Sequence, residues 1–155
     1  MTNDLTFYTN PMSRGGIVHW MLEEIGQPYD LKVIEYGPDM KSEAYLAINP
    51  MGKVPSLVHG KRVITECAAI CAYLADAFPD AELAPKPADR ADYYRWLFFA
   101  AGPVEAAVGA KSCGLEPDEK QQAMSSSGRI RRRGIHLPLR KTLCLLEAID
   151  QRRYR

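Results

Sequence analysis

The hydrophobic pattern in the first part of the chain alternates between short strand-like runs and helical periods. Residues 5–9 (LTFYT) are β-branched and aromatic and end at an Asn-Pro pair, which predicts a strand followed by a turn. From Ser13 to Ile25 the apolar residues recur at helical spacing and Gly26 ends the pattern, so we expect a helix with Ser13 as its N-cap. Residues 29–36 (YDLKVIEY) alternate apolar with polar positions and predict a second strand, parallel to the first.

The next segment predicts a short helix, a hairpin and a longer helix. Residues 42–48 have helical spacing and stop at a second Asn-Pro pair. Two β-branched runs, at 55–59 and 62–65, flank Gly60-Lys61, which is typical of a hairpin. Residues 66–78 place their apolar side chains largely on one helical side. The resulting order is βαβ, helix, ββα, which is an α/β arrangement.

Prolines then interrupt the pattern before a helical segment begins. The sequence PDAELAPKP indicates a linker, and aromatic residues recur at helical spacing from residue 88 onward. We therefore expect a domain at 1–80, a linker at 81–87, a partial helical domain at 88–124 and an atypical basic tail at 125–155.

Composition adds few constraints. Hydrophobic residues make up 46% and charged residues 25% of the chain, as in soluble globular proteins. No apolar run is long enough to cross a membrane, and the first residues lack a secretory signal pattern, so we expect a cytoplasmic location. The four cysteines and three histidines show no metal-ligand spacing, so we expect no metal.

The net charge of +1 conceals an uneven distribution. Residues 129–155 hold nine Lys/Arg and two Asp/Glu, a net of +7, while the rest hold eleven and seventeen, a net of −6. A basic stretch of this kind can bind nucleic acid or acidic membranes. A reading-frame change near residue 125 would produce the same arginine-rich composition. We expect no nucleic-acid or membrane binding by this tail.

Four stretches of the chain carry a family pattern. They are FYTNPMSRG (7–15), NPMGKVPSL (49–57), ITECAAICAYLADAFP (64–79) and ADYYRWLFFAAGPVE (91–105). In this order and spacing they resemble a bacterial cytosolic glutathione S-transferase of the serine type, over about residues 4–124. The resemblance implies a thioredoxin-like N-terminal domain followed by an incomplete all-α C-terminal domain.

The resemblance also implies an activity. This is the conjugation of the glutathione thiolate to small hydrophobic electrophiles in detoxification, by a homodimer. Glutathione would be the co-substrate, with no cofactor bound permanently. The alternative is a catalytically weak or inactive glutathione-binding protein, truncated or frame-altered beyond residue 124. A thiol-disulfide oxidoreductase would need a cysteine near residues 10–13, and the sequence has none there.

Five residues are implied to bind glutathione. The family's proline before the hairpin is cis, so Pro55 would leave the N–H and C=O of Val54 free to pair with the cysteinyl backbone. The alternative is a trans proline at a strand start. Glu66 would hold the ammonium group, or merely complement the helix dipole. Cys67 replaces the family's serine with a weaker donor. Lys53 would meet the glycine carboxylate, or remain solvated.

Ser13 is implied to be the catalytic residue. A hydroxyl donor at a helix N-terminus stabilises a thiolate, which is the reactive form of the sulfur. A plain helix cap is the alternative role for this serine. Tyr8 is the alternative donor, although a core position inside the strand suits it better. Tyr94 and Phe98, on the first helix of the second domain, would line the pocket for the hydrophobic co-substrate unless they serve only in packing.

Overall fold

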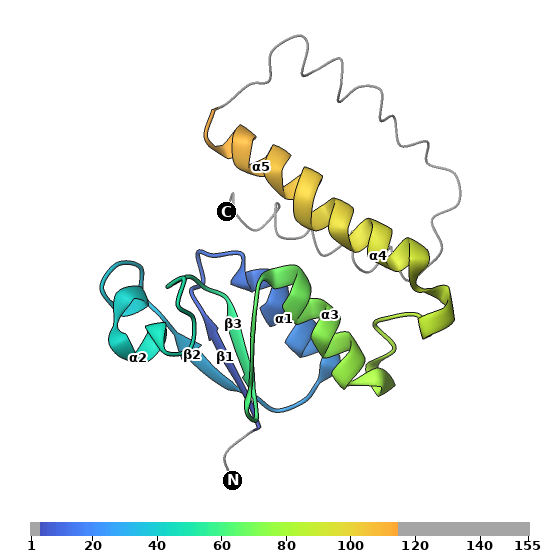
Figure 1. Cartoon of the computed structure of the whole chain (residues 1–155), viewed down its shortest axis with the longest axis horizontal. Helices are drawn as coiled ribbons and strands as arrows, with labels where there is room; N and C mark the ends of the chain where they lie inside the picture. The colour runs from blue at the N-terminus through green and yellow to red at the C-terminus, as the bar shows by residue number, and fades with distance from the viewer. Residues whose placement is uncertain (1–3, 115–155) are drawn as a thin grey trace.

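The structure, a computed structural model, describes residues 4–114 (Figure 1). The predicted tail at 125–155 and the end of the predicted helical domain at 115–124 lie outside the described residues. A four-stranded sheet forms the centre, in the order β2-β1-β3-β4. The strands are β1 (Leu5–Thr9), β2 (Asp30–Val33), β3 (Ser56–His59) and β4 (Arg62–Thr65).

The sheet is mixed. β1 pairs in parallel with β2 through the crossover helix α1 (Gly15–Ile25), and β3 pairs antiparallel with both β1 and β4. The hairpin turns at Gly60, whose φ of 59° lies in the left-handed region that glycine adopts without steric cost. The remaining helices of this domain are α2 (Glu43–Leu46) and α3 (Cys67–Ala77). The predicted βαβ, helix, ββα order is confirmed.

The hydrophobic core lies between the sheet and the helix pair α1 and α3, which pack side by side on one face (Figure 1). Alternation along β1 directs Leu5 and Phe7 into this core, whereas Tyr8 packs against α2, with its ring 5.8 Å from that of Tyr45. The core is apolar, and its members are Leu5, Phe7, Val18, Met21, Leu22, Ile25, Leu57, Ile70, Leu74 and Ala75.

Three element boundaries differ from the prediction. The N-cap of α1 is Arg14, which makes no side-chain cap hydrogen bond; the capping bond to the N–H of Gly15 comes from the hydroxyl of Ser13, one residue earlier. The second strand covers only Asp30–Val33, a largely exposed edge strand. α2 is a single turn whose N-cap, Ser42, accepts a hydrogen bond from the N–H of Tyr45.

Helical structure resumes after two short 3₁₀ turns, at Pro79–Ala81 and Pro87–Asp89. α4 (Arg90–Phe99) and α5 (Glu105–Ser112) are joined by a π-helical turn, Ala100–Val104. Pro103 lies inside this turn and has no backbone N–H to donate. No residue of α4 is buried. Within residues 4–114, no helix combines the length and the hydropathy that crossing a bilayer would require.

Candidate functional site

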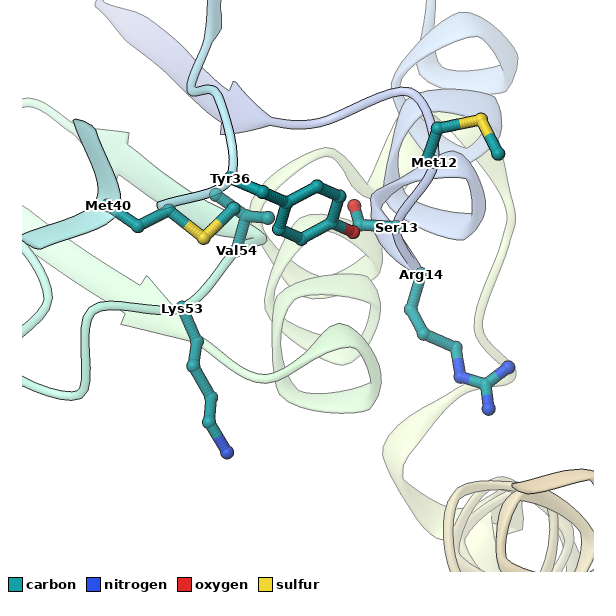
Figure 2. A pocket seen from close by; sticks show the side chains of 7 residues that line it. All are labelled: Met12, Ser13, Arg14, Tyr36, Met40, Lys53 and Val54. Carbon is teal, nitrogen blue, oxygen red and sulfur yellow. The ribbon is translucent and has the colours of Figure 1, made fainter. Parts of the chain in front are cut away.

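A cavity of about 370 Å³ opens where the turn after β1, the loop after β2 and the loop before β3 meet (Figure 2). The carboxyl ends of two parallel strands lie at one edge of a sheet, which is why the segments following β1 and β2 converge here. Ser13, Lys53 and Val54, three of the predicted site residues, line this cavity. The complete lining is Met12, Ser13, Arg14, Tyr36, Met40, Lys53 and Val54.

The turn that carries Ser13 is held by Asn10, which is 3% exposed. Its side-chain Nδ2 donates to the carbonyl of Ile34 at 3.0 Å, and its Oδ1 accepts the N–H of Met12 at 2.9 Å. The Ser13 hydroxyl donates to the Asn10 carbonyl at 2.7 Å and accepts the N–H of Gly15 at 3.0 Å. Asn10 therefore ties the Ser13 turn to the segment after β2 and so fixes one wall of the cavity.

The opposite wall is held by a buried polar network beneath Lys53. The carbonyl of Lys53 accepts the Tyr45 hydroxyl at 2.7 Å and the Asn49 Nδ2 at 2.8 Å. Both side chains also reach the Ser56 Oγ, at 3.0 Å and 3.2 Å. Burial raises the pKa of Tyr45, so its hydroxyl remains protonated and available as a donor. The network holds the backbone at residue 53 in place.

Val54 and Pro55 follow that network. Their peptide bond is cis, as the sequence resemblance implied. Within residues 4–114, neither the N–H nor the C=O of Val54 makes a hydrogen bond. The pairing of Ser56 with Thr65 places Glu66, which precedes α3, at the same end of the hairpin as Pro55. The loop and the helix start are therefore neighbours, although Glu66 does not line the cavity.

Cys67, the first residue of α3, touches the edge of the cavity through Arg14. Its thiol donates to the Arg14 carbonyl at 3.3 Å. Burial, with the negative charges of Glu105 and Glu66, raises the pKa of Cys67 to about 12 against the opposing charge of Arg14. The sulfur is therefore a protonated, weakly donating thiol at neutral pH.

Arg14 also joins the two parts of the described chain. Its guanidinium forms an ion pair with Glu105, the first residue of α5. A second ion pair, between Arg90 and Asp76 at 2.6 Å, ties α4 to α3. The helical segment is thus attached by charged contacts to the turn and to the helix that frame the cavity.

Sequence reasoning missed Met12, Arg14, Tyr36 and Met40 as lining residues. Tyr36 is 56% exposed, and its side chain points toward Ser13 in Figure 2. Its position shortly after β2, at the same sheet edge as Ser13, is the signal that would have identified it.

Six predicted residues do not line this cavity. Pro55, Glu66 and Cys67 lie in the segments next to it, and the other three lie elsewhere. Tyr8 packs against α2 instead. Tyr94 and Phe98, on α4, are 42% and 67% exposed and do not line the cavity either. In the described part of the chain, no group of three or more His, Cys, Asp or Glu residues is arranged to hold a metal ion.

Part of the sequence matches a known protein family. Residues 16–77 fit the family model of the glutathione S-transferase N-terminal domain. Glutathione S-transferase GST-4.5 of Xanthomonas campestris pv. campestris is 35% identical over 97 residues, covering 61% of this chain and 47% of that protein. The chain spans about half or less of the length of the curated relatives it matches first.

Solved structures give the same result. The theta class glutathione S-transferase of Xanthomonas axonopodis pv. citri, solved with glutathione bound, has a TM-score of 0.58 at 31% identity. That match covers 65% of this chain and 50% of that one. A glutathione transferase homolog from Drosophila mojavensis, also with bound glutathione, has a TM-score of 0.65 at 27% identity, covering 82% and 63%. The mixed sheet is thioredoxin-like, and residues 16–77 of this chain match the glutathione S-transferase N-terminal domain family.

Proposed function

We propose that the chain binds glutathione in the cavity around Ser13 and conjugates its thiolate to small hydrophobic electrophiles. One observation carries the proposal. Val54, whose backbone N–H and C=O make no hydrogen bond within residues 4–114, lines the same cavity as Ser13, so a peptide held by Val54 could place a sulfur near the Ser13 hydroxyl. The glutathione bound to the similar solved structures supports this choice of ligand.

The binding step uses backbone pairing and charge. Glutathione would add to Val54 as an extra strand, through the N–H and C=O of its cysteinyl residue. The Lys53 ammonium would meet the glycine carboxylate. The N–H groups of the first turn of α3, beginning at Cys67, would receive the γ-glutamyl carboxylate, and Glu66 would meet its ammonium group. Pro55 would lie between Val54, which pairs with glutathione, and the first residue of β3.

The chemical step depends on ionising the sulfur. A free thiol titrates near ~8.5, and only the thiolate is a good nucleophile. Donation by the Ser13 hydroxyl, beside the N-terminus of α1, would lower that value. The thiol proton passes to solvent. The sulfur lone pair then forms a C–S bond with the electrophilic carbon, and the leaving group departs with its bonding electrons.

The surroundings of the sulfur would receive the electrophile. Met12 and Tyr36 are exposed beside Ser13, and we include Tyr94 and Phe98 of α4 as a second apolar contact.

We extend the proposal to a detoxifying enzyme of the cytoplasm that acts as a homodimer. The exposed apolar side chains of α4 support a subunit contact. The free thiols of the described cysteines support a reducing compartment.

Cys67 favours a second candidate function, glutathione binding without useful turnover. The weak thiol donor stands where the family resemblance implies a serine. Two assays separate the candidates: retention on immobilised glutathione, and conjugation of a generic aryl halide. Retention without conjugation supports the second candidate.

The test of the first candidate is Ser13→Ala beside Ser112→Ala, which removes an exposed hydroxyl of α5. We expect Ser13→Ala to abolish conjugation while sparing most retention, and Ser112→Ala to change neither. Equal conjugation rates in the two variants would remove Ser13 from the mechanism. Absence of both retention and conjugation in the unaltered chain would contradict the proposal as a whole.

A further inference from the structure

The Ser13 hydroxyl has a single proton, and the structure shows where it goes. It is donated to the carbonyl of Asn10, with 2.7 Å between the oxygens. Stabilising a thiolate requires that proton to turn away from Asn10 and toward the sulfur. The Asn10 carbonyl is not left unpaired by this turn, because the backbone N–H of Ser13 also donates to it, at 2.9 Å. The hydroxyl is therefore free to exchange one acceptor for another.

The oxygen itself is held by Gly15. The N–H of this residue donates to the Ser13 Oγ at 3.0 Å. That bond uses a lone pair of the oxygen and not its proton, so it persists whichever way the hydroxyl points. Donation to the oxygen also polarises the O–H bond and strengthens it as a donor.

Gly15 can approach this closely only because it has no side chain. A Cβ at this position would lie 1.9 Å from the Thr9 Oγ1 and 2.9 Å from the Ser13 Oγ. Thr9 is 5% exposed at the end of β1, so it has little freedom to withdraw. A Cβ on the neighbouring Gly16 would have nothing within 4 Å. Of the two adjacent glycines, only Gly15 is required by its surroundings.

We propose that Gly15 is a positioning residue for the conjugation reaction. It fixes the Ser13 oxygen through its N–H and leaves the space that the hydroxyl needs in order to turn from the Asn10 carbonyl to the thiolate. A side chain at this position would displace the Ser13 hydroxyl and weaken its contact with the sulfur. This inference rests on the proposed function of Ser13.

The experiment compares Gly15→Ala with its matched control, Gly16→Ala, in the full chain. The readouts are retention on immobilised glutathione and the pH dependence of kcat/KM with an aryl halide. For Gly15→Ala we expect kcat/KM to fall by about tenfold or more, as small misplacements of catalytic groups do. The acidic limb of the pH profile of kcat/KM should move to higher pH because the thiolate is less stabilised, while retention on glutathione persists. Gly16→Ala should keep the rate and the pH profile of the unaltered chain.

The clash with Thr9 is separable from the effect on Ser13. Thr9→Ala removes Oγ1, the atom at 1.9 Å, so Thr9→Ala combined with Gly15→Ala leaves the contact with the Ser13 Oγ at 2.9 Å and a milder one with the Thr9 Cβ at 3.1 Å. The comparison of this double variant with Thr9→Ala alone decides the question if Gly15→Ala alone fails to fold. We expect the double variant to have a lower kcat/KM and a higher acidic pKa than Thr9→Ala.

A double variant that matches Thr9→Ala in both readouts would overturn the inference. Ser13→Ala, assayed in parallel, keeps the two claims distinct. If Ser13→Ala retains the full rate, the proposed function of Ser13 fails. If it is inactive while alanine at position 15 has no effect, only the positioning role of Gly15 fails.

Discussion

The thiol of Cys67 donates a hydrogen bond to the backbone carbonyl of Arg14, with 3.3 Å between Sγ and O. The first residue of α3 therefore touches the turn that carries Ser13, although Cys67 and Arg14 are 53 positions apart in sequence. This contact joins the two halves of the proposed glutathione site. It also places the weakest donor of the site where the γ-glutamyl carboxylate would bind.

Cys67→Ser should strengthen glutathione binding. A hydroxyl donates a stronger hydrogen bond than a thiol, and one improved bond of about 1 kcal/mol corresponds to roughly fivefold in affinity. Calorimetric titration of the full chain with glutathione measures the change. Cys113→Ser, at an exposed position, is the control and should leave the affinity unaltered. An unchanged or weaker affinity in Cys67→Ser would place the carboxylate elsewhere.

Cys67 should react slowly with iodoacetamide. Its pKa of about 12 leaves very little thiolate near pH 8, whereas Cys113 is exposed to the reagent. Mass spectrometry of the native protein over time should show Cys113 modified well before Cys67. Comparable rates for the two thiols would show that the pKa of Cys67 is not raised as described.

The same reaction tests the effect of Glu105. Its charge raises the pKa of Cys67, so Glu105→Gln should lower that pKa and accelerate alkylation of Cys67. The control is Glu43→Gln, at an exposed position of α2, which should leave the rate unchanged. The Arg14–Glu105 ion pair is partly exposed, so its loss should reduce the free energy of unfolding by no more than about 1 kcal/mol.

Tyr45→Phe should destabilise the domain through the loop before β3. The substitution removes a buried hydroxyl that bonds to Lys53 and Ser56, and we expect a loss of about 1–3 kcal/mol in the free energy of unfolding. Tyr8→Phe is the matched control, because within residues 4–114 the Tyr8 hydroxyl makes no hydrogen bond. Denaturant titration of both variants makes the comparison. Equal losses would mean that the network does not support the loop.

Tyr36 should determine the preference for aromatic electrophiles. Its exposed ring beside Ser13 offers a stacking surface worth about 0.5–1.5 kcal/mol. Tyr36→Ala should therefore raise KM for an aryl halide several-fold, while Tyr36→Phe should preserve it. KM for a small aliphatic electrophile is the internal control and should stay constant. A proportional change for both electrophiles would assign Tyr36 a role other than stacking.

The fold of the first domain could be predicted because its patterns are local. LTFYT is β-branched and aromatic and ends at an Asn-Pro pair, and β1 covers the same residues, Leu5–Thr9. Gly60-Lys61 marked the hairpin between β3 and β4. The boundary of α1 could not be predicted, since the hydroxyl of Ser13 is shared between a carbonyl behind it and an amide ahead of it.

The site was only partly predictable, because a cavity depends on contacts between distant segments. Ser13, Lys53 and Val54 were identified through motifs, and the structure places them in one cavity. The pairing of Arg14 with Glu105 depends on how α5 lies against the turn after β1, which no local pattern records. Tyr36 was missed for a similar reason, since it reaches the cavity from the loop after an exposed edge strand.

The most direct test measures the ionisation of glutathione bound to the full chain, followed by the ultraviolet absorbance of the thiolate against pH. We predict stoichiometric binding, with the bound sulfur half-ionised at least about one pH unit below the ordinary thiol value of ~8.5. Ser13→Ala should still bind glutathione but return the titration to that ordinary value. A bound thiol that titrates like the free one in the unaltered chain, or no binding at all, would contradict the account.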